Sequence, residues 1–209
     1  MKIAVIGANG KAGKLITAEA VSRDLDVTAI VRSENQSPAQ HVIQKDLFEL
    51  TYDDLKPFDV IIDAFGAWTP ETLHLHSESL AYLCDVLSGK PNRLLVVGGA
   101  GGLFVDDALT IKLTDTPDFP EAFKPLALAL GKSLDELRLR NDVQWTFVSP
   151  AADFVADGER TGSYQVGGEQ LILNHNQEST ISYADYAIGM IDEATQGNAI
   201  QKRISLCSK

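Results

Sequence analysis

Three glycines and a lysine stand at regular spacing near the start of the sequence, in Gly7-Ala8-Asn9-Gly10-Lys11-Ala12-Gly13. This segment follows a short apolar run and precedes a helical pattern. A glycine turn between a strand and a helix suits phosphate chemistry, because backbone can approach a pyrophosphate and the N–H groups that open the helix bind the anion. The alternative is a turn without a ligand. The spacing favours a dinucleotide loop with contacts from Gly7, Asn9, Gly10, Lys11, Ala12 and Gly13.

The residue that ends the second strand indicates which dinucleotide is preferred. Sites for NAD place an acidic residue there to hold the ribose 2′-hydroxyl, whereas an arginine suits the 2′-phosphate of NADP. Here Arg32 stands where the acid would, and Lys11 could add a second positive charge. We therefore predict that NADP(H) is preferred over NAD(H). The alternative is that Arg32 is a solvated residue that closes the strand.

The elements that must position this loop alternate along the chain. Apolar runs without polar alternation predict strands covered on both faces, and apolar residues at helical spacing separate them. This pattern predicts an α/β fold, a Rossmann-type doubly wound parallel sheet with helices on both faces. The predicted strands are 3–6, 27–31, 41–44, 60–63, 94–97 and 145–148, and the helical sets lie within 15–25, 73–87 and 126–137.

The last third of the chain has a different pattern. Two short runs, 163–166 and 170–173, flank Gly167-Gly168 and predict a hairpin. Ser182, with Asp185 three residues later, predicts the start of a helix that runs to about Thr195 and stops at Gly197. A final strand is expected at 200–206, and loops at 33–40, 115–120 and 151–162. We expect one domain over 1–209, in which about 151–209 contributes a small substrate-side lobe.

Composition excludes several classes of protein. The chain has 209 residues, of which 44% are hydrophobic and 22% charged, so it is neither fibrous nor wholly disordered. Its net charge of −11 argues against nucleic-acid binding. The longest uncharged apolar stretch, 94–105, is broken by glycines and falls short of the ~20 residues that a bilayer requires. Cys84 and Cys207 form no CxxC pair. We expect a cytoplasmic protein without a membrane or nucleic-acid partner.

Further segments resemble a known family. The spacing Gly-x-x-Gly-x-x-Gly resembles the atypical short-chain dehydrogenases/reductases, and residues 3–10 are similar to the NAD(P)H-binding group that includes NmrA-like proteins and biliverdin reductase B. Later segments resemble bacterial proteins provisionally named NADH-flavin reductases. These segments are 93–101, 115–120, 145–151, 158–162 and 181–187.

The resemblance implies further cofactor contacts at the carboxyl ends of strands, where open α/β sheets bind ligands. One group would edge the adenine, a second would pass beside the ribose and pyrophosphate, and a third would approach the nicotinamide. Asp46 could equally be a turn-forming residue without a ligand. In that order, the groups are Asp46 and Leu47; Ala64, Phe65 and Gly66; and Gly98, Gly99, Pro150 and Ala151.

The proton-donating pair of ordinary short-chain dehydrogenases is missing. The Tyr-x-x-x-Lys pattern is matched only by Tyr52 and Lys56, which lie between the third and fourth strands. No tyrosine occurs between Tyr82 and Tyr164, and Gly101-Gly102 stands where a serine is expected. The sequence therefore argues against alcohol–ketone chemistry by the usual mechanism.

Hydride transfer to a flavin makes weaker demands, because positioning can suffice with little or no protein acid. We therefore expect an NAD(P)H-dependent reductase that takes a flavin, or a planar quinone-like acceptor, as substrate. The alternative is a non-catalytic NmrA-like sensor of NADP(H) that acts through a protein partner. A sugar-nucleotide epimerase ranks last, since it needs the Tyr-Lys pair and a larger substrate domain.

The remaining polar residues give weaker signals. Lys132 is a weak catalytic candidate that could pair with a substrate anion, although a solvated lysine is the favoured interpretation. His74 and His76 cannot chelate one metal ion together, because residues two apart on a helix point in nearly opposite directions. We expect no metal site. A homodimer is compatible with the sequence but does not follow from it.

Overall fold

The structure is a computed structural model that describes residues 1–197 and 199–209, and it confirms the predicted α/β architecture. One eight-stranded sheet has the order β3-β2-β1-β4-β5-β6-β10-β8, and β7 and β9 form a second sheet. The strands are β1 (Lys2–Ile6), β2 (Asp26–Val31), β3 (His41–Gln44), β4 (Val60–Asp63), β5 (Arg93–Val97), β6 (Gln144–Ser149), β7 (Asp153–Val155), β8 (Tyr164–Gly167), β9 (Thr180–Ser182) and β10 (Lys202–Ser208). The helices are α1 (Lys11–Ser22), α2 (Tyr52–Leu55), α3 (Leu75–Val86), α4 (Lys124–Leu137) and α5 (Tyr183–Gln196), with 3-10 turns η1 (Leu47–Glu49), η2 (Leu113–Asp115) and η3 (Glu121–Phe123).

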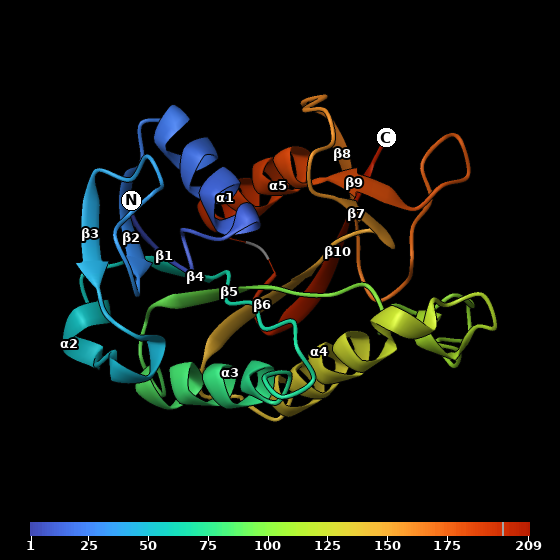
Figure 1. Cartoon of the computed structure of the whole chain (residues 1–209), viewed down its shortest axis with the longest axis horizontal. Helices are drawn as coiled ribbons and strands as arrows, with labels where there is room; N and C mark the ends of the chain where they lie inside the picture. Colours follow the sequence, from blue (N-terminus) through green and yellow to red (C-terminus); the bar gives the residue numbers. More distant parts are fainter. Residues whose placement is uncertain (198) are drawn as a thin grey trace.

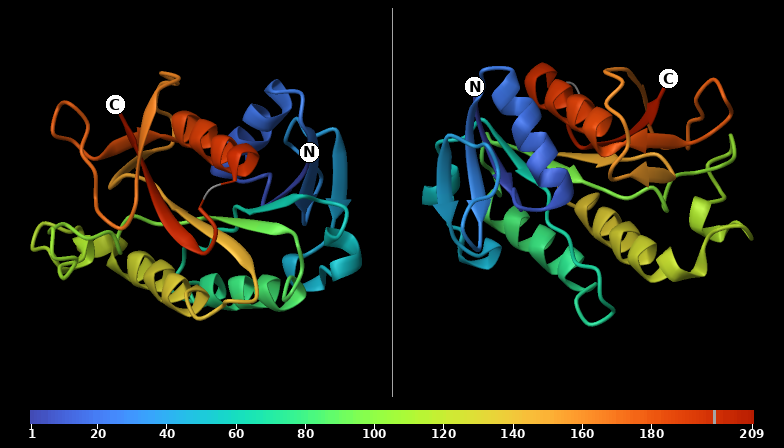
Figure 2. Two further views of the ribbon diagram at one scale, coloured as in Figure 1. Left: turned by 180° about the vertical axis from the view of Figure 1, so that it is seen from behind. Right: turned by 45° about the horizontal axis from the view of Figure 1, so that its top comes forward.

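Helices cover both faces of the large sheet, α1 and α5 on one face and α3 and α4 on the other (Figure 1 and Figure 2). Successive side chains of a strand point to opposite faces. Ile62 therefore packs in the core beneath α1 and α5, whereas Ile61 packs in the core beneath α3 and α4. Burial on both faces explains why the strands appear in the sequence as unbroken apolar runs.

The strand order reverses between β1 and β4, which are parallel neighbours. From this point β2 and β3 extend the sheet to one side, and β4, β5 and β6 extend it to the other. Open α/β sheets bind ligands in the crevice outside the carboxyl ends of the strands at such a reversal. The glycine loop leaves the end of β1 and therefore lies at this crevice.

Both predicted ends of the last helix are confirmed. The Ser182 hydroxyl accepts a hydrogen bond from the Asp185 N–H at 3.0 Å, which caps the start of α5. Gly197 has a φ of +67° and closes α5 in the left-handed conformation that glycine adopts readily. Within the part of the chain that the structure describes, no helix is long and apolar enough to cross a membrane.

The predicted hairpin around Gly167-Gly168 is wrong. β8 does form, but it pairs antiparallel with β10. Residues 170–173 form no strand, because Gln170 makes a single bridge to Phe104 and the Leu171 N–H donates to the Phe104 carbonyl at 2.8 Å. The long strand β10 offers β8 a complete ladder of backbone partners, which outweighs the local turn signal.

Two other predictions for the last third need correction. The segment 151–162, expected to be a loop, contains β7, which pairs in parallel with β9. The final strand begins at Lys202 rather than at residue 200. The expected substrate-side lobe of residues 151–209 stays a prediction.

Candidate functional site

The glycine loop brings three elements into close backbone contact. Gly7 has a φ of +72°, and a Cβ there would lie 2.6 Å from the carbonyl oxygen of Ala64, just after β4. A Cβ on Gly13, in α1, would lie 2.3 Å from the carbonyl oxygen of Gly7. Gly10 is exposed, and its N–H donates to the Gly7 carbonyl at 2.9 Å. Gly7 and Gly13 thus permit the packing of β1, α1 and the β4 end, while Gly10 keeps the outer surface of the loop open.

The start of α1 offers free hydrogen-bond donors. No side chain caps the helix at Gly10. The Lys14 N–H donates to the Gly10 carbonyl at 2.9 Å, but within residues 1–197 and 199–209 the N–H groups of Lys11, Ala12 and Gly13 have no backbone acceptor. The helix dipole adds about half a positive charge at this end. These donors suit a pyrophosphate.

Asn9 ties the glycine loop to the segment that follows β2. Its side-chain nitrogen donates to the Glu34 carbonyl at 2.9 Å and lies 3.3 Å from the Ser33 hydroxyl, and its side-chain oxygen accepts the Gln36 N–H at 2.7 Å. Lys14 donates to the Gln36 side chain at 3.0 Å. The glycine loop and residues 33–36 therefore hold each other in place. The Asn9 side chain serves this contact, which the sequence analysis did not foresee.

Arg32 is exposed and directly precedes Ser33, so the bonds of Asn9 hold it beside the glycine loop. Its carbonyl accepts a long bond from Gln44 at 3.5 Å. No ion pair joins its guanidinium to any residue that the structure describes, and the same holds for the exposed Lys11. Both cations are thus available to an anionic ligand.

Both the carboxylate and the backbone N–H of Asp46 form hydrogen bonds within the chain. Its carboxylate accepts the Phe48 N–H at 3.0 Å, and the Glu49 side chain accepts the Asp46 N–H at 3.2 Å, which together cap η1. The Leu47 side chain is buried in the core. This geometry favours the alternative that Asp46 forms a turn, and a contact of either residue with adenine stays a prediction.

A buried acid lies beneath the predicted strip Ala64-Phe65-Gly66. Asp63 ends β4 and is only 4% exposed, and its carboxylate accepts the Phe65 N–H at 3.0 Å. Burial raises the pKa of Asp63 to about 6. No prediction from the sequence included Asp63, although a single acid at the end of an apolar run was a usable signal.

The chain beyond this strip is held by His76 at the start of α3. The His76 Nε2 lies 2.9 Å from the Ala67 carbonyl oxygen, and the ring packs edge-on against Phe65. Burial lowers the pKa of His76, which is thus a packed core histidine. Among the described residues, no three His, Cys, Asp or Glu side chains gather as a metal site.

The indole of Trp68 lies beside the backbone of Gly66, since a Cβ on Gly66 would be 3.2 Å from its Nε1. Trp68 is 71% exposed, far more than an ordinary core aromatic. No prediction from the sequence included Trp68. Its contact with Gly66 places it next to the residues predicted to pass beside the ribose and pyrophosphate.

A backbone hydrogen bond joins the carboxyl ends of β5 and β6. The Gly98 N–H donates to the Val148 carbonyl at 2.9 Å, and the same carbonyl accepts the Tyr186 hydroxyl at 2.7 Å. Pro150 and Ala151 are buried immediately after β6. A Cβ on Gly99 would lie 2.7 Å from the end of the Leu130 side chain of α4. The residues expected near the nicotinamide therefore lie together at the carboxyl ends of β5 and β6.

Arg203 of β10 supports the segment that follows β5. Its guanidinium is almost fully buried, donates to the Gly102 carbonyl at 2.8 Å and pairs with the Glu169 carboxylate. Glu169 also accepts a bond from Arg138 at 2.7 Å. The sequence offered no signal for this bridge, because its members lie far apart in the chain.

Four of the five tyrosines are engaged elsewhere. Tyr82 and Tyr186 donate to backbone carbonyls, Tyr164 donates to Asp192, and the Tyr52 ring lies beneath the Lys90 ammonium. Tyr183 packs against Phe154, with ring centroids 3.8 Å apart, and burial raises its pKa. Within the described chain its hydroxyl has no hydrogen-bond partner. Tyr183 is therefore the tyrosine most able to meet a ligand.

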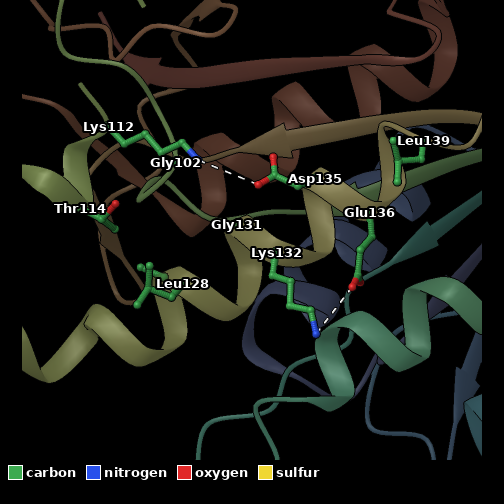
Figure 3. A pocket seen from close by; sticks show the side chains of 10 residues that line it. Gly102, Lys112, Thr114, Leu128, Gly131, Lys132, Asp135, Glu136 and Leu139 are labelled. Atoms are coloured by element: carbon green, nitrogen blue, oxygen red, sulfur yellow. Dashed lines mark ion pairs between the residues drawn. The ribbon is translucent and has the colours of Figure 1, made fainter. Parts of the chain in front are cut away.

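Lys132 lies away from this edge. It stands on the exposed face of α4, 3.6 Å from Glu136, and lines a shallow groove of about 360 Å³ with Leu128, Asp135 and Leu139 (Figure 3). None of the residues that line the groove belongs to the predicted cofactor set. The structure thus gives the catalytic hypothesis for Lys132 no support, and the hypothesis stays a prediction.

One family model and several known proteins match most or all of this chain. The model of the NAD(P)H-binding family matches residues 7–194. YwnB of Bacillus subtilis, described as uncharacterized, is 48% identical over 100% of this chain and 99% of its own. A Streptococcus pneumoniae protein provisionally named an NADH-flavin reductase is 58% identical, with a TM-score of 0.98 over 100% of both chains.

A Bacteroides thetaiotaomicron protein provisionally named an epimerase is 33% identical, with a TM-score of 0.84 over 99% of this chain and 96% of its own. The names of these relatives therefore disagree on the reaction, while the fold and the family agree. The free N–H groups of the glycine loop at the strand-order reversal are what a dinucleotide fold requires. On this evidence the chain belongs to the NAD(P)H-binding family, with the Rossmann-like fold that its sequence predicts.

Proposed function

We propose that this protein is an NADPH-preferring reductase that transfers hydride to a flavin, or to a similar planar acceptor such as a quinone. The flavin would be a substrate and not a tightly bound cofactor. The observation that carries the proposal is the pairing of two features. The glycine loop presents unused N–H donors, and Asn9 holds the exposed Arg32 beside it.

The preference for NADPH rests on charge and geometry. A 2′-phosphate carries about two negative charges and accepts several hydrogen bonds, which a planar guanidinium meets with two parallel N–H groups. Arg32 and Lys11 are exposed cations, and the Ser33 hydroxyl lies beside Asn9. No acid takes the position of Arg32 at the end of β2, where a ribose hydroxyl would be held in an NAD site.

The choice of acceptor rests on what the residues can supply. Ketone reduction needs a proton donor beside the carbonyl. Tyr52 and Lys56 belong to the α2 region, and the other tyrosines except Tyr183 are committed to the chain. Flavin N5 accepts hydride while charge spreads over the ring, so positioning can suffice. The provisional name of the Streptococcus pneumoniae relative supports the same acceptor.

The cofactor assignment is tested with Arg32→Ala. We expect NADPH binding to weaken by about 1–3 kcal/mol, roughly 5- to 150-fold in Kd, with NADH binding unchanged. Titration calorimetry of both cofactors measures this, and Lys56→Ala, directly after α2, is the control for loss of a surface cation. Equal losses for NADPH and NADH would overturn the 2′-phosphate assignment.

The reaction is tested by stopped-flow oxidation of NADPH with and without excess FMN, with NADH alongside. Oxidation that depends on FMN and saturates in both components supports the reductase. Tight NADPH binding without oxidation, across flavins and quinones, would contradict it. That result would favour the non-catalytic sensor, whose basis is the missing Tyr-Lys pair.

A further inference from the structure

Four residues of α4 and of the turn that follows it form an exposed seam. Leu128, Lys132 and Asp135 follow one another at steps of four and three residues, so they lie along one side of the helix. Leu139 lies in the turn and lines the same groove. Leu128 is 56% exposed and Leu139 is 82% exposed. The Lys132 and Asp135 side chains are 70% and 56% exposed. Figure 3 shows all four along the same groove.

The seam is free because α4 uses its other side for the core. Ser133, Leu134 and Leu137 are buried against the sheet and α3. Gly131 flanks the seam, and a Cβ there would meet no atom within 4 Å. A second helix could therefore approach α4 closely along this side.

The spacing of the seam is the same from either end, and reversal exchanges its lysine for its aspartate. Leucines stand at both ends, and Lys132 and Asp135 stand symmetrically about the midpoint between Ser133 and Leu134. An antiparallel second copy, related by a two-fold axis at this midpoint, would place Leu128 opposite Leu139 and Lys132 opposite Asp135. Each contact would occur twice, as a two-fold interface requires.

The charges of the seam complement those of a second copy that lies antiparallel to it, although both chains are acidic overall. Each copy carries a net charge of −11, so two copies repel one another over most of their surface. At the seam, Lys132, which lies 3.6 Å from Glu136 of its own chain, would face Asp135 and Glu136 of the second copy. Asp135 now has only longer contacts, at 3.3 Å to Arg138 and 4.0 Å to Lys112. Exposed pairs of this kind are weak and can exchange at little cost.

We propose that α4 is the contact surface of a symmetric homodimer, in which two seams pair antiparallel. The helix has 14 residues and is about 21 Å long, so the pair buries less than a standard interface of about 1,600 Å². The dimer is therefore reversible and depends on protein concentration. The seam contains none of the predicted cofactor residues, so both dinucleotide sites stay open in the dimer.

Sedimentation equilibrium over a range of protein concentrations, at low and moderate salt, tests the proposal. In the dimer, Lys132→Glu would place a glutamate of each copy opposite Asp135 and Glu136 of the other. We expect this substitution to weaken the dimer at least tenfold. Adding Asp135→Lys to Lys132→Glu restores an opposite-charge pair across the two-fold axis, and we expect the dimer to return. Lys56→Glu, directly after α2, makes the same charge change away from the seam and should leave the dimer intact.

All substituted side chains are exposed, so each variant should keep the circular dichroism spectrum and melting temperature of the parent. A monomer at every concentration would overturn the proposal. So would a dimer that Lys132→Glu does not weaken, or a double variant that stays as weak as the single one. None of these outcomes depends on reductase activity.

Discussion

Replacing Asp63 by asparagine should change how the stability of this protein depends on pH. Asp63 ends β4, is 4% exposed, and accepts one backbone hydrogen bond, from the Phe65 N–H. Burial raises its pKa from 3.8 to about 6. Asparagine has nearly the same shape, can accept the same bond and carries no charge at any pH.

The size of the effect follows from the pKa difference between the folded and unfolded chains. A raised pKa means that the folded state binds the Asp63 proton more tightly than the unfolded chain does. The stability that this proton contributes is fully present below pH 3.8, the pKa of the unfolded chain, and is lost as pH rises through about 6. Each pKa unit corresponds to about 1.4 kcal/mol. Ionised Asp63 should therefore lower the free energy of unfolding by about 3 kcal/mol above neutral pH.

Urea denaturation at several values between pH 4 and pH 8 measures this effect. Between pH 4 and pH 8, we expect the free energy of unfolding of Asp63→Asn to rise by about 2 to 3 kcal/mol relative to that of the parent. The slope of this free energy against urea concentration should be unchanged. Asp118→Asn, which removes an exposed carboxylate, serves as the control and should show no such gain. A difference between parent and Asp63→Asn that is the same at pH 4 and pH 8 would refute the reasoning.

Three further predictions follow from the packing and the site. Gly13→Ala should lower the free energy of unfolding in thermal melts by about 1–3 kcal/mol, because its Cβ would overlap the Gly7 carbonyl. Gly131→Ala, where a Cβ meets open space, should raise it by up to about 1 kcal/mol. Equal effects of the two substitutions would contradict the glycine-loop geometry. Arg203→Met should cost about 2–4 kcal/mol in urea titrations, because it strands buried acceptors, and a loss below about 0.5 kcal/mol would show that the bridge is not needed. Tyr183→Phe should change kcat for FMN reduction less than about threefold, and a loss of 100-fold or more would identify a protein acid.

The sequence predicted those parts of the fold that short segments determine. The glycine loop depends on backbone geometry within seven residues, and the Ser182 and Gly197 caps depend on their own dihedral angles and nearest neighbours. The parallel, doubly wound character of the sheet follows from the alternation of strands and helices along the chain. These features need little information from distant parts of the chain.

The errors and omissions arose where partners lie far apart in sequence. β8 pairs with β10, not with the run beyond Gly167-Gly168, and no local signal records that competition. The Arg203 contact with Gly102 spans 101 residues. The direction in which Lys132 points depends on which side of α4 meets the sheet, and helical spacing alone did not settle this. The sequence shows an acid at position 63, but its raised pKa depends on burial that only the assembled core creates.

The position of β10 has a consequence for how the protein is made. β10 is the last strand in the chain, yet it lies between β6 and β8, and β8 joins the large sheet through β10. While the chain emerges from the ribosome, residues 164–167 have no strand to pair with until residues 202–208 have followed. The nascent chain must therefore keep an open edge on β6 during synthesis, which exposes it to mispairing and to chaperones. Slower translation before β10 would lengthen that exposure.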